Sequence, residues 1–269
     1  MNENNQPQYE HDELTRTVEP EVIRMGVASR IISIFVSPGE LMRNVKVYPT
    51  VLVPYLLAVV LGIITIFPTT ALSEMILQEM SIISIERYGV DFFDVSALAD
   101  IYGDTQATVS VDAVTMATNI AGALFMPLII SFFAALGLFI MSKICKGQSR
   151  LGQLFSMYMH VYVIMAVGTL VVAFLMTMTG TYLDITSLAA LAMPQGRIDS
   201  VAFIILSSIN IFNIWATLVT VIGLKIINEF SMIKAVVITI IAFLFSLLIA
   251  VVFTMMAWWM LDMTSGMVM

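Results

Sequence analysis

Five long apolar runs, separated by polar segments, dominate the pattern of hydrophobic and polar positions along the chain. The clearest of them, from Ala235 to Met256, holds no charged residue in 22 positions. At about 1.5 Å of helical rise per residue it would extend roughly 33 Å, enough to cross a hydrocarbon layer of about 30 Å. This run therefore predicts a transmembrane helix.

A polar hinge with Lys225, Glu229 and Lys234 precedes this run and joins it to another apolar run. Because a charge at the bilayer centre costs about 2.5–3.5 kcal/mol on insertion scales, we place the hinge in the headgroup layer. The same reasoning along the whole chain predicts an all-α membrane protein, a five-transmembrane-helix bundle. Its spans are expected at residues 49–68, 120–141, 154–176, 203–224 and 235–256.

The residues before the first span divide into a tail and a membrane-surface region. Residues 1–21 are polar and acidic, so we expect a mobile acidic cytoplasmic tail. In the region 22–47, apolar residues recur at helical spacing between residues 25 and 36, which predicts an amphipathic interfacial helix. Its basic residues Arg24 and Arg30 would face lipid headgroups; packing of the helix against the bundle is the alternative.

A second short helix is expected directly after the first. Ser37, Pro38 and Glu40 have the pattern of a capping box with proline at the first helical position, and the helix would continue through Lys46. The five-span membrane domain then occupies residues 48–269.

A long extracytoplasmic loop, residues 73–119, is expected after Pro68, which should mark the exit of the first span. The loop holds eight acids and one base, and its apolar residues predict one or two short amphipathic helices that fold back over the bundle. Two pairs of acids could attract a divalent cation, but a solvated acidic face is the alternative because the ordered series of a calcium loop is absent. The pairs are Asp91 with Asp94 and Asp100 with Asp104.

Composition and charge fit this topology. The chain is 59% hydrophobic and 12% charged, whereas a soluble domain carries about 25% charged residues. The five-span arrangement places ten of the 12 Lys and Arg residues on one side of the membrane. By the positive-inside rule that side is cytoplasmic. We expect a multi-pass protein of the cell membrane with a cytoplasmic N-terminus and an extracytoplasmic C-terminus.

Catalytic chemistry has little support in the sequence. The chain contains two histidines and one cysteine, Cys145, and lacks G-x-S-x-G, H-E-x-x-H and Gly-rich phosphate-loop motifs. We therefore expect no enzyme activity, no cofactor, no metal site and no nucleic-acid partner.

Two groups of polar residues are candidate interaction sites. The first is an intramembrane polar seam, whose alternative interpretation is interhelical hydrogen bonding; no Asp or Glu lies within a predicted span to support a proton relay. Its members are Ser207, Asn210, Asn213 and Thr217 on the fourth span and His160 on the third. The second is a cytoplasmic interaction surface formed by Arg24, Arg30, Lys143, Lys146, Arg150, Lys225, Glu229 and Lys234.

Three segments of the chain resemble the bacterial branch of the Yip1 family over roughly residues 37–252. The first two are SPGELMRNVKVYPTVLVPYLL and KGQSRLGQLFSMYMHVYV. The third is the final hairpin, with Trp215, Gly223, Leu224, Phe230, Ser231, Lys234 and Ala235. The resemblance implies five packed helices and, in bacteria, accessory subunits of ABC-type exporters.

Two departures from the family pattern bear on partners. The D-L-Y-G-P motif of the eukaryotic branch does not precede the first span, and Tyr158 and Tyr162 are not followed by the expected proline. A small GTPase is therefore not expected as a partner. We expect contacts with membrane lipids and with a membrane protein, either a transporter subunit or a second copy of the chain. The leading hypothesis is a non-catalytic membrane adaptor; a small transporter or lipid-handling protein that uses the polar seam is the alternative.

Overall fold

The computed structural model describes residues 23–88, 107–181, 183–192 and 200–265. The predicted tail and the acidic pairs between Asp91 and Asp104 lie outside these residues. The described part is helical, apart from turns and one isolated bridge between Ser187 and Asn210. Its helices are α1 (Val27–Val36), α2 (Pro38–Val47), α3 (Leu52–Tyr88), α5 (Ala107–Ile144), α6 (Leu151–Thr179), α7 (Leu188–Ala192), α8 (Val201–Ser207), α9 (Ile211–Asn228) and α10 (Met232–Ser265).

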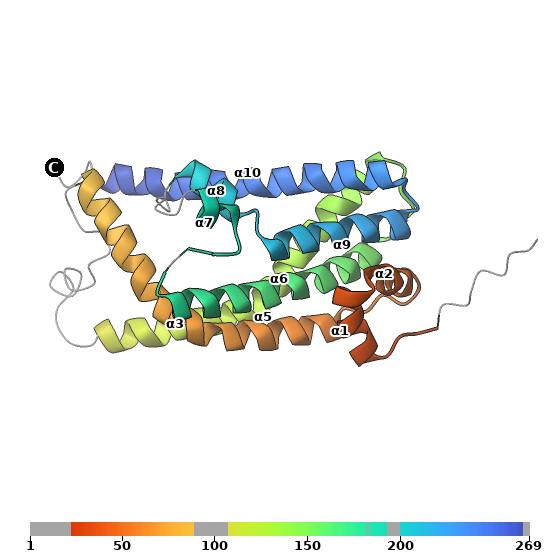
Figure 1. Cartoon of the computed structure of the whole chain (residues 1–269), viewed down its shortest axis with the longest axis horizontal. Coiled ribbons are helices and arrows are strands. Elements are labelled where there is room, and N and C mark those ends of the chain that lie inside the picture. Colours follow the sequence, from red (N-terminus) through yellow and green to blue (C-terminus); the bar gives the residue numbers. More distant parts are fainter. Residues whose placement is uncertain (1–22, 89–106, 182, 193–199, 266–269) are drawn as a thin grey trace, which may run out of the picture.

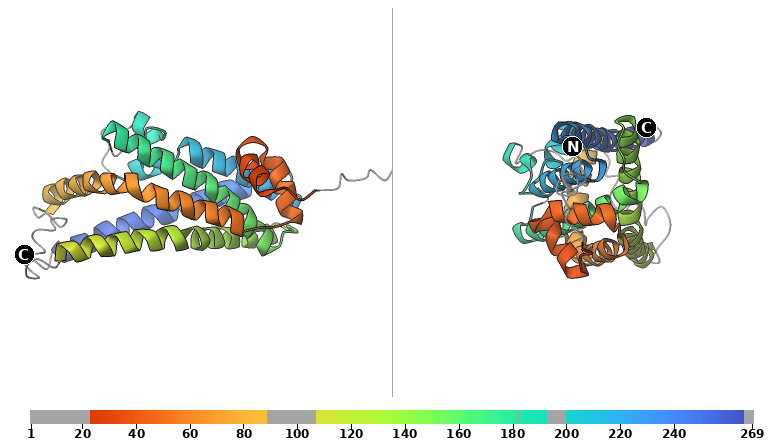
Figure 2. Two further views of the ribbon diagram at one scale, coloured as in Figure 1. Left: turned by 90° about the horizontal axis from the view of Figure 1, so that it is seen from below. Right: turned by 90° about the vertical axis from the view of Figure 1, so that its right-hand side faces the viewer.

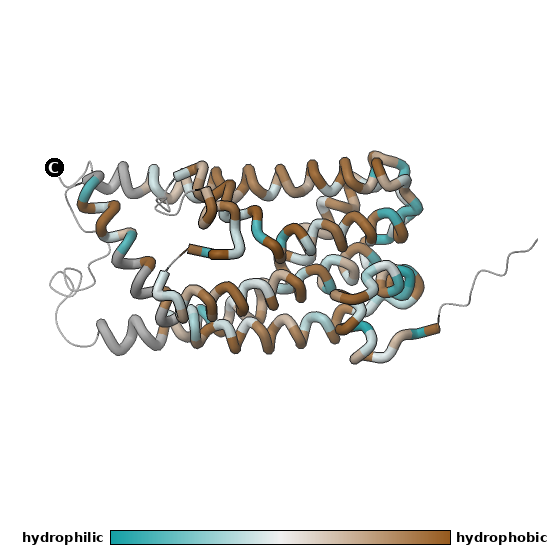
Figure 3. Tube along the Cα trace, viewed as in Figure 1, coloured by the Kyte–Doolittle hydropathy of each residue, from teal (hydrophilic) through white to brown (hydrophobic). Residues whose placement is uncertain are grey.

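Among the described residues, five helices contain stretches that are long and apolar enough to cross a membrane, which confirms the predicted all-α bundle of five spans. These helices run along the length of the molecule, and most of their residues are hydrophobic (Figures 1 and 3). The apolar stretches are Leu52–Thr69, Val114–Ile144, Leu151–Thr179, Ile211–Asn228 and Met232–Met260.

Helix α6 is the central element of the bundle. It packs against α3, α5 and α9, while α10 packs on α9 and α5 (Figures 1 and 2). Its residues Leu154, Met157 and Ile164 are fully buried and form one core with Val219 and Leu224 of α9. The short helices α1 and α2 lie at one end of the bundle, where α2 contacts α9 and α6.

The first apolar stretch ends at Thr69, beside Pro68 as expected, but the helix does not end there. Helix α3 continues through Pro68 to Tyr88, and its ribbon bends sharply between the orange and the gold part in Figure 1. A proline inside a helix causes such a kink because it removes a backbone hydrogen bond and its ring displaces the preceding turn. The hydroxyl of Thr69 donates to the carbonyl oxygen of Thr65 at 2.8 Å beside the kink.

Most of the predicted outer loop is also helical. Residues 73–88 belong to α3 and residues 107–119 begin α5, so separate short helices are wrong for these segments. The remainder, 89–106, lies outside the described residues. In the same way, α5 continues through Pro127. Both long helices therefore extend beyond the spans expected from apolar runs alone.

The fourth span is shorter than expected because the helix breaks between Ser207 and Ile211. Helix α8 ends at Ser207, and Asn210 is the N-cap of α9, where its side chain accepts a hydrogen bond of 2.9 Å from the backbone N–H of Asn213. Asn and Ser side chains compete with helical backbone bonds, which explains a break at this sequence. The 18 residues of α9 extend about 27 Å, close to the thickness of the hydrocarbon layer.

The predicted capping box at α2 is only partly present. Ser37 is the N-cap residue and Pro38 opens the helix, as expected, but the Ser37 side chain makes no cap hydrogen bond. The N–H of Glu40 donates instead to the backbone oxygen of Ser37 at 3.1 Å.

Helices α6 and α9 are in close contact at Gly168. A Cβ atom at this position would lie 2.6 Å from Cβ of Phe212, so no larger residue fits without displacement of the ring. Gly137 on α5, by contrast, has nothing within 4 Å of its Cβ direction. The two glycines thus have different structural requirements although both lie in apolar helices.

We expect Gly168→Ala to destabilise the protein by about 1–3 kcal/mol, because overpacking forces Phe212 and the α9 backbone to move. Gly137→Ala is the matched control and should leave stability unchanged or raised, since Ala favours helix. Thermal unfolding of the purified variants in detergent measures both effects. Equal melting temperatures for the two variants would contradict the tight contact.

Candidate functional site

Most of the predicted interaction residues gather at the end of the bundle that carries α1 and α2. This end also holds the turn between α5 and α6, residues 145–150, and the turn between α9 and α10, residues 229–231. Figure 3 shows polar residues concentrated there. We call this part of the molecule the basic end.

Arg30 is buried at the basic end, which corrects the expectation that it faces lipid headgroups. Only 3% of its surface is exposed. Its guanidinium donates hydrogen bonds to Asn44 Oδ1 at 2.6 Å, to the Tyr48 carbonyl oxygen at 3.2 Å, and to the Thr50 hydroxyl. Arg24, on the same segment, is exposed. The side of α1 that carries Arg30 therefore packs against the protein, which was the alternative expectation.

The Arg30 contacts explain why this buried cation is tolerated. The carbonyl at the end of α2 and the amide of Asn44 supply acceptors that water would otherwise supply. Burial, followed by the positive charge of Arg24, lowers the pKa of Arg30 below its ordinary value. An arginine nevertheless remains protonated in proteins, so the guanidinium acts here as a fixed multiple donor.

Hydrogen bonds also join the α2–α3 connection to α6. The N–H of Thr50 donates to Ser156 Oγ at 2.9 Å, and the Ser156 hydroxyl donates back to the Thr50 carbonyl oxygen at 2.7 Å. Gln153 Nε2 donates to the Lys46 carbonyl oxygen at 2.7 Å. These bonds link segments more than a hundred residues apart and fix the N-terminal helices on the bundle.

Two of the predicted interaction residues are engaged within the protein. Glu229 forms an ion pair of 2.6 Å with Lys46 of α2. The Lys234 ammonium donates to the Cys145 carbonyl oxygen and lies 4.4 Å from the centre of the Phe230 ring. Both contacts connect the α9–α10 turn to other parts of the basic end.

The other basic residues point outwards. Lys143, Lys146, Arg150 and Lys225 are exposed, together with Arg24 and with Arg43, which the sequence did not single out. Lys143 keeps a long hydrogen bond of 3.4 Å to the Gly147 carbonyl oxygen. The basic end is therefore a set of exposed cations on a framework fixed by internal hydrogen bonds.

The predicted polar seam separates into two places. Asn210 caps α9, and Asn213 Nδ2 donates to the Ser208 carbonyl oxygen at 3.0 Å. The Thr217 hydroxyl donates to the Asn213 carbonyl oxygen at 2.7 Å, while Ser207 ends α8. These hydrogen bonds are local to the helix break, but Asn210 Nδ2 also donates to Asp184 Oδ2, outside the break, at 3.2 Å. The helix break therefore explains these polar residues, whereas the alternative interpretation was hydrogen bonding between neighbouring helices.

His160 lies apart from these residues, in the part of α6 nearer the basic end. It is 1% exposed, and its Nδ1 is 2.7 Å from the Ser156 carbonyl oxygen. No hydrogen-bond partner for Nε2 occurs among the described residues. The described residues likewise contain no cluster of three His, Cys, Asp or Glu side chains that could hold a metal ion.

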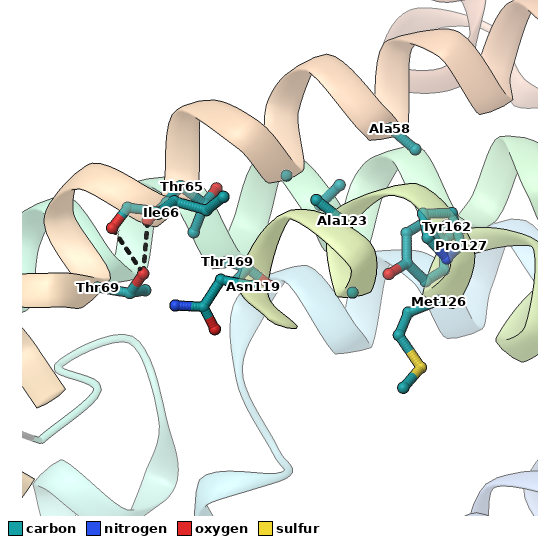
Figure 4. A pocket seen from close by; sticks show the side chains of 13 residues that line it. Ala58, Thr65, Ile66, Thr69, Asn119, Ala123, Met126, Pro127, Tyr162 and Thr169 are labelled. Atoms are coloured by element: carbon teal, nitrogen blue, oxygen red, sulfur yellow. Dashed lines mark hydrogen bonds between the residues drawn. The ribbon is translucent and has the colours of Figure 1, made fainter. Parts of the chain in front are cut away.

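Two adjoining cavities lie away from the basic end. The smaller, about 260 Å³, lies between α3, α5 and α6, where Thr65, Asn119 and Tyr162 contribute polar groups (Figure 4). The larger, about 470 Å³, is bordered by α3, α6 and the start of α9, and we call it the α3–α6–α9 cavity. Thr69 and Thr169 line both cavities.

Sequence reasoning missed three residues that organise these sites. Asn44 holds Arg30, Asn228 Oδ1 accepts from the Ser149 N–H at 3.2 Å, and Asp184 binds the Asn210 side chain at 3.2 Å. Asp184 carried a usable signal, because Asp-x-Thr is typical of a side-chain turn. The two asparagines have partners distant in the chain, which local patterns do not reveal.

We expect Arg30→Met to destabilise the protein by about 1–3 kcal/mol, because it leaves Asn44 and the Tyr48 carbonyl without their donor. Arg43→Met, an exposed change on α2, is the control and should shift stability by less than about 0.5 kcal/mol. Thermal unfolding, together with limited proteolysis of the N-terminal helices, provides the measurement. Indistinguishable behaviour of the two variants would show that the Arg30 contacts do not hold these helices in place.

Comparison with known proteins identifies the family. The family model described as Yip1 domain matches residues 32–260, which is most of the chain. No curated protein and no solved structure matched the chain. Together with five apolar helices that can cross a membrane, the family match makes this chain an integral membrane protein, and it belongs to the Yip1 family.

Proposed function

We propose that this protein is a non-catalytic adaptor of the cell membrane that binds another membrane protein through its basic end. Its N-terminus and basic end would lie in the cytoplasm and its C-terminus outside. A transporter complex, such as an ABC-type exporter, is the partner class to test first, and self-association is the simpler variant of the same role. The protein itself would position or stabilise that complex.

The observation that carries this proposal is the fixed arrangement of exposed cations at the basic end. Lys143 lies in the last turn of α5, and Lys146 and Arg150 lie on the short turn that follows. The Ser149–Asn228 and Lys234–Cys145 hydrogen bonds hold this turn in place. A surface that is already ordered loses less conformational entropy when it binds. Complementary charge on a partner would then supply orientation and speed of association.

The apolar helices give the partner a second place to bind. Most residues of the α10 apolar stretch are not buried within the protein. Lipid chains cover such a surface in a bilayer, and a partner helix can replace them at close range. The protein thus offers contacts at two depths, one in the headgroup layer and one in the hydrocarbon.

The geometry gives less support to catalysis or to transport through the polar seam. Asn210 and Asn213 use hydrogen-bonding groups in the local structure of the α9 cap. Among the described residues, buried His160 has no carboxylate bonded to it. These contacts favour a binding role over a reaction or a relay.

The proposed orientation predicts the labelling of single cysteines. With Cys145 replaced by Ser, Lys143→Cys should react with a membrane-impermeant maleimide only after permeabilisation, whereas Thr115→Cys should react in intact cells. Both positions are exposed and lie near opposite ends of α5. The reverse labelling pattern would invert the topology, and equal labelling would contradict a crossing between these positions.

The adaptor role predicts capture of a membrane protein after mild detergent extraction. Reversal of Lys143, Lys146 and Arg150 to Glu should reduce the captured amount about tenfold or more, since each 1.4 kcal/mol lost is a factor of ten. The control variant K143R/K146R/R150K keeps the charge and should retain the partner. Quantitative mass spectrometry of the captured material measures the ratio. Recovery of the protein alone under several mild detergents would overturn the adaptor proposal.

A further inference from the structure

We propose that the α3–α6–α9 cavity is a binding site for a membrane lipid whose head carries a primary ammonium group. The lipid would enter from the leaflet opposite the basic end, with its ammonium at Asp184 and an acyl chain between α3 and α6. This site is independent of the adaptor role, because it lies at the other end of α9.

The cavity has the size and composition of a ligand site. Its volume of about 470 Å³ falls within the usual range of about 300–1,000 Å³, whereas the neighbouring cavity of about 260 Å³ falls below it. Apolar side chains of α3 and α6 form most of the wall, and polar groups gather where the helix breaks before α9. The polar groups there are Asp184, Asn210 and Asn213.

Asp184 retains the capacity to bind a cationic donor. One carboxylate oxygen accepts from the N–H and the hydroxyl of Thr186 at 2.8 and 2.6 Å, and the other accepts from Asn210 Nδ2 at 3.2 Å. A carboxylate offers about four acceptor positions, so one remains. No Lys or Arg forms an ion pair with Asp184 in the part of the chain that the structure describes.

The cavity has a polar end at the level of lipid headgroups and an apolar wall at the level of the acyl chains. Helix α9 extends about 27 Å from Asn228 at the basic end to its cap at Asn210, so Asp184 and Asn210 lie near the far boundary of the hydrocarbon layer. The α6 wall, from Met165 to Met176, continues from this level towards the middle of the bundle. A headgroup at Asp184 therefore places its acyl chain against the apolar wall.

The ammonium head is favoured over other headgroups by hydrogen-bond chemistry. A primary ammonium donates up to three hydrogen bonds, so it can use the free acceptor position of Asp184 and retain its own solvation. A choline head has no N–H donor, and a glycerol head has no positive charge. The site should consequently prefer phosphatidylethanolamine to phosphatidylcholine and to phosphatidylglycerol.

Native mass spectrometry of the full-length protein, with each of these three lipids added to detergent micelles, tests the headgroup. We expect retention of phosphatidylethanolamine about tenfold above the other two, and loss of this preference in Asp184→Asn. The Asn side chain still accepts from Thr186, so the local turn should persist. Glu79→Gln, which removes an acid outside the cavity lining, is the matched control and should keep the preference.

A second pair of variants tests the acyl chain. Val172→Trp fills the cavity and should reduce retention of phosphatidylethanolamine about tenfold. Val171→Trp adds the same bulk on the exposed side of α6, where 38% of Val171 is accessible, and should have no effect. Melting temperatures establish that each variant is folded; if Val172→Trp fails to fold, Asp184→Asn decides the result.

Equal retention of the three lipids by the unmodified protein would overturn the proposal, as would a headgroup preference that survives Asp184→Asn. Preference for the anionic lipid would overturn it as well, because that result assigns lipid binding to basic residues instead. Loss of partner capture without loss of lipid preference would leave this site standing and reject only the adaptor role.

Discussion

The requirement that polar groups inside a hydrocarbon layer find partners within the protein governs this structure. Each unsatisfied backbone group in the bilayer core costs several kcal/mol, so the spans are helices. Hydroxyl groups on these helices follow the same rule and donate to the carbonyl four residues earlier. This pattern holds for Thr65, Thr169, Thr220 and Thr239.

The two places where helices end inside or near the membrane show the rule most clearly. At the basic end, backbone groups of Thr50 that lie outside a helix are bonded by Ser156 of α6. At the break before α9, the side chains of Asn210 and Asn213 supply bonds within the chain itself. A break is possible because the sequence provides its own replacements for the lost helical bonds.

The sequence was sufficient to predict the five spans because a run of some twenty apolar residues has one stable solution in lipid. Helix ends were less predictable. Pro68 was interpreted as an exit, yet the helix continues beyond it with a kink, since neighbouring helices can compensate for the missing backbone bond. The break before α9 has a local cause, the Asn210 side chain that caps the helix. This cap could be recognised only once the apolar run was known to form two helices instead of one.

Candidate sites depend more on tertiary contacts. Arg30 has the spacing of a surface residue in a basic amphipathic helix, and only its meeting with Asn44 and Thr50 makes a buried position stable. The bases of the α5–α6 turn are exposed, because burial of a charged side chain next to a span would be costly. To predict that a polar residue is buried, one must therefore know its hydrogen-bond partners. Exposure of a charged residue can be predicted from the free-energy cost of burying it.

The shortness of α9 links the fold to both proposed roles. Its neighbours α6 and α10 each have an apolar stretch of 29 residues, but α9 has only 18. Because α9 begins where its neighbours still continue, a space remains beside α6, and the residues before the cap border it. The other terminus of α9 lies at the basic end, where Asn228 and Glu229 fasten the turns that carry the exposed cations. One helix therefore supports the charged surface at one end and opens the cavity at the other, so a ligand that orders its cap would act on an element shared with the basic end.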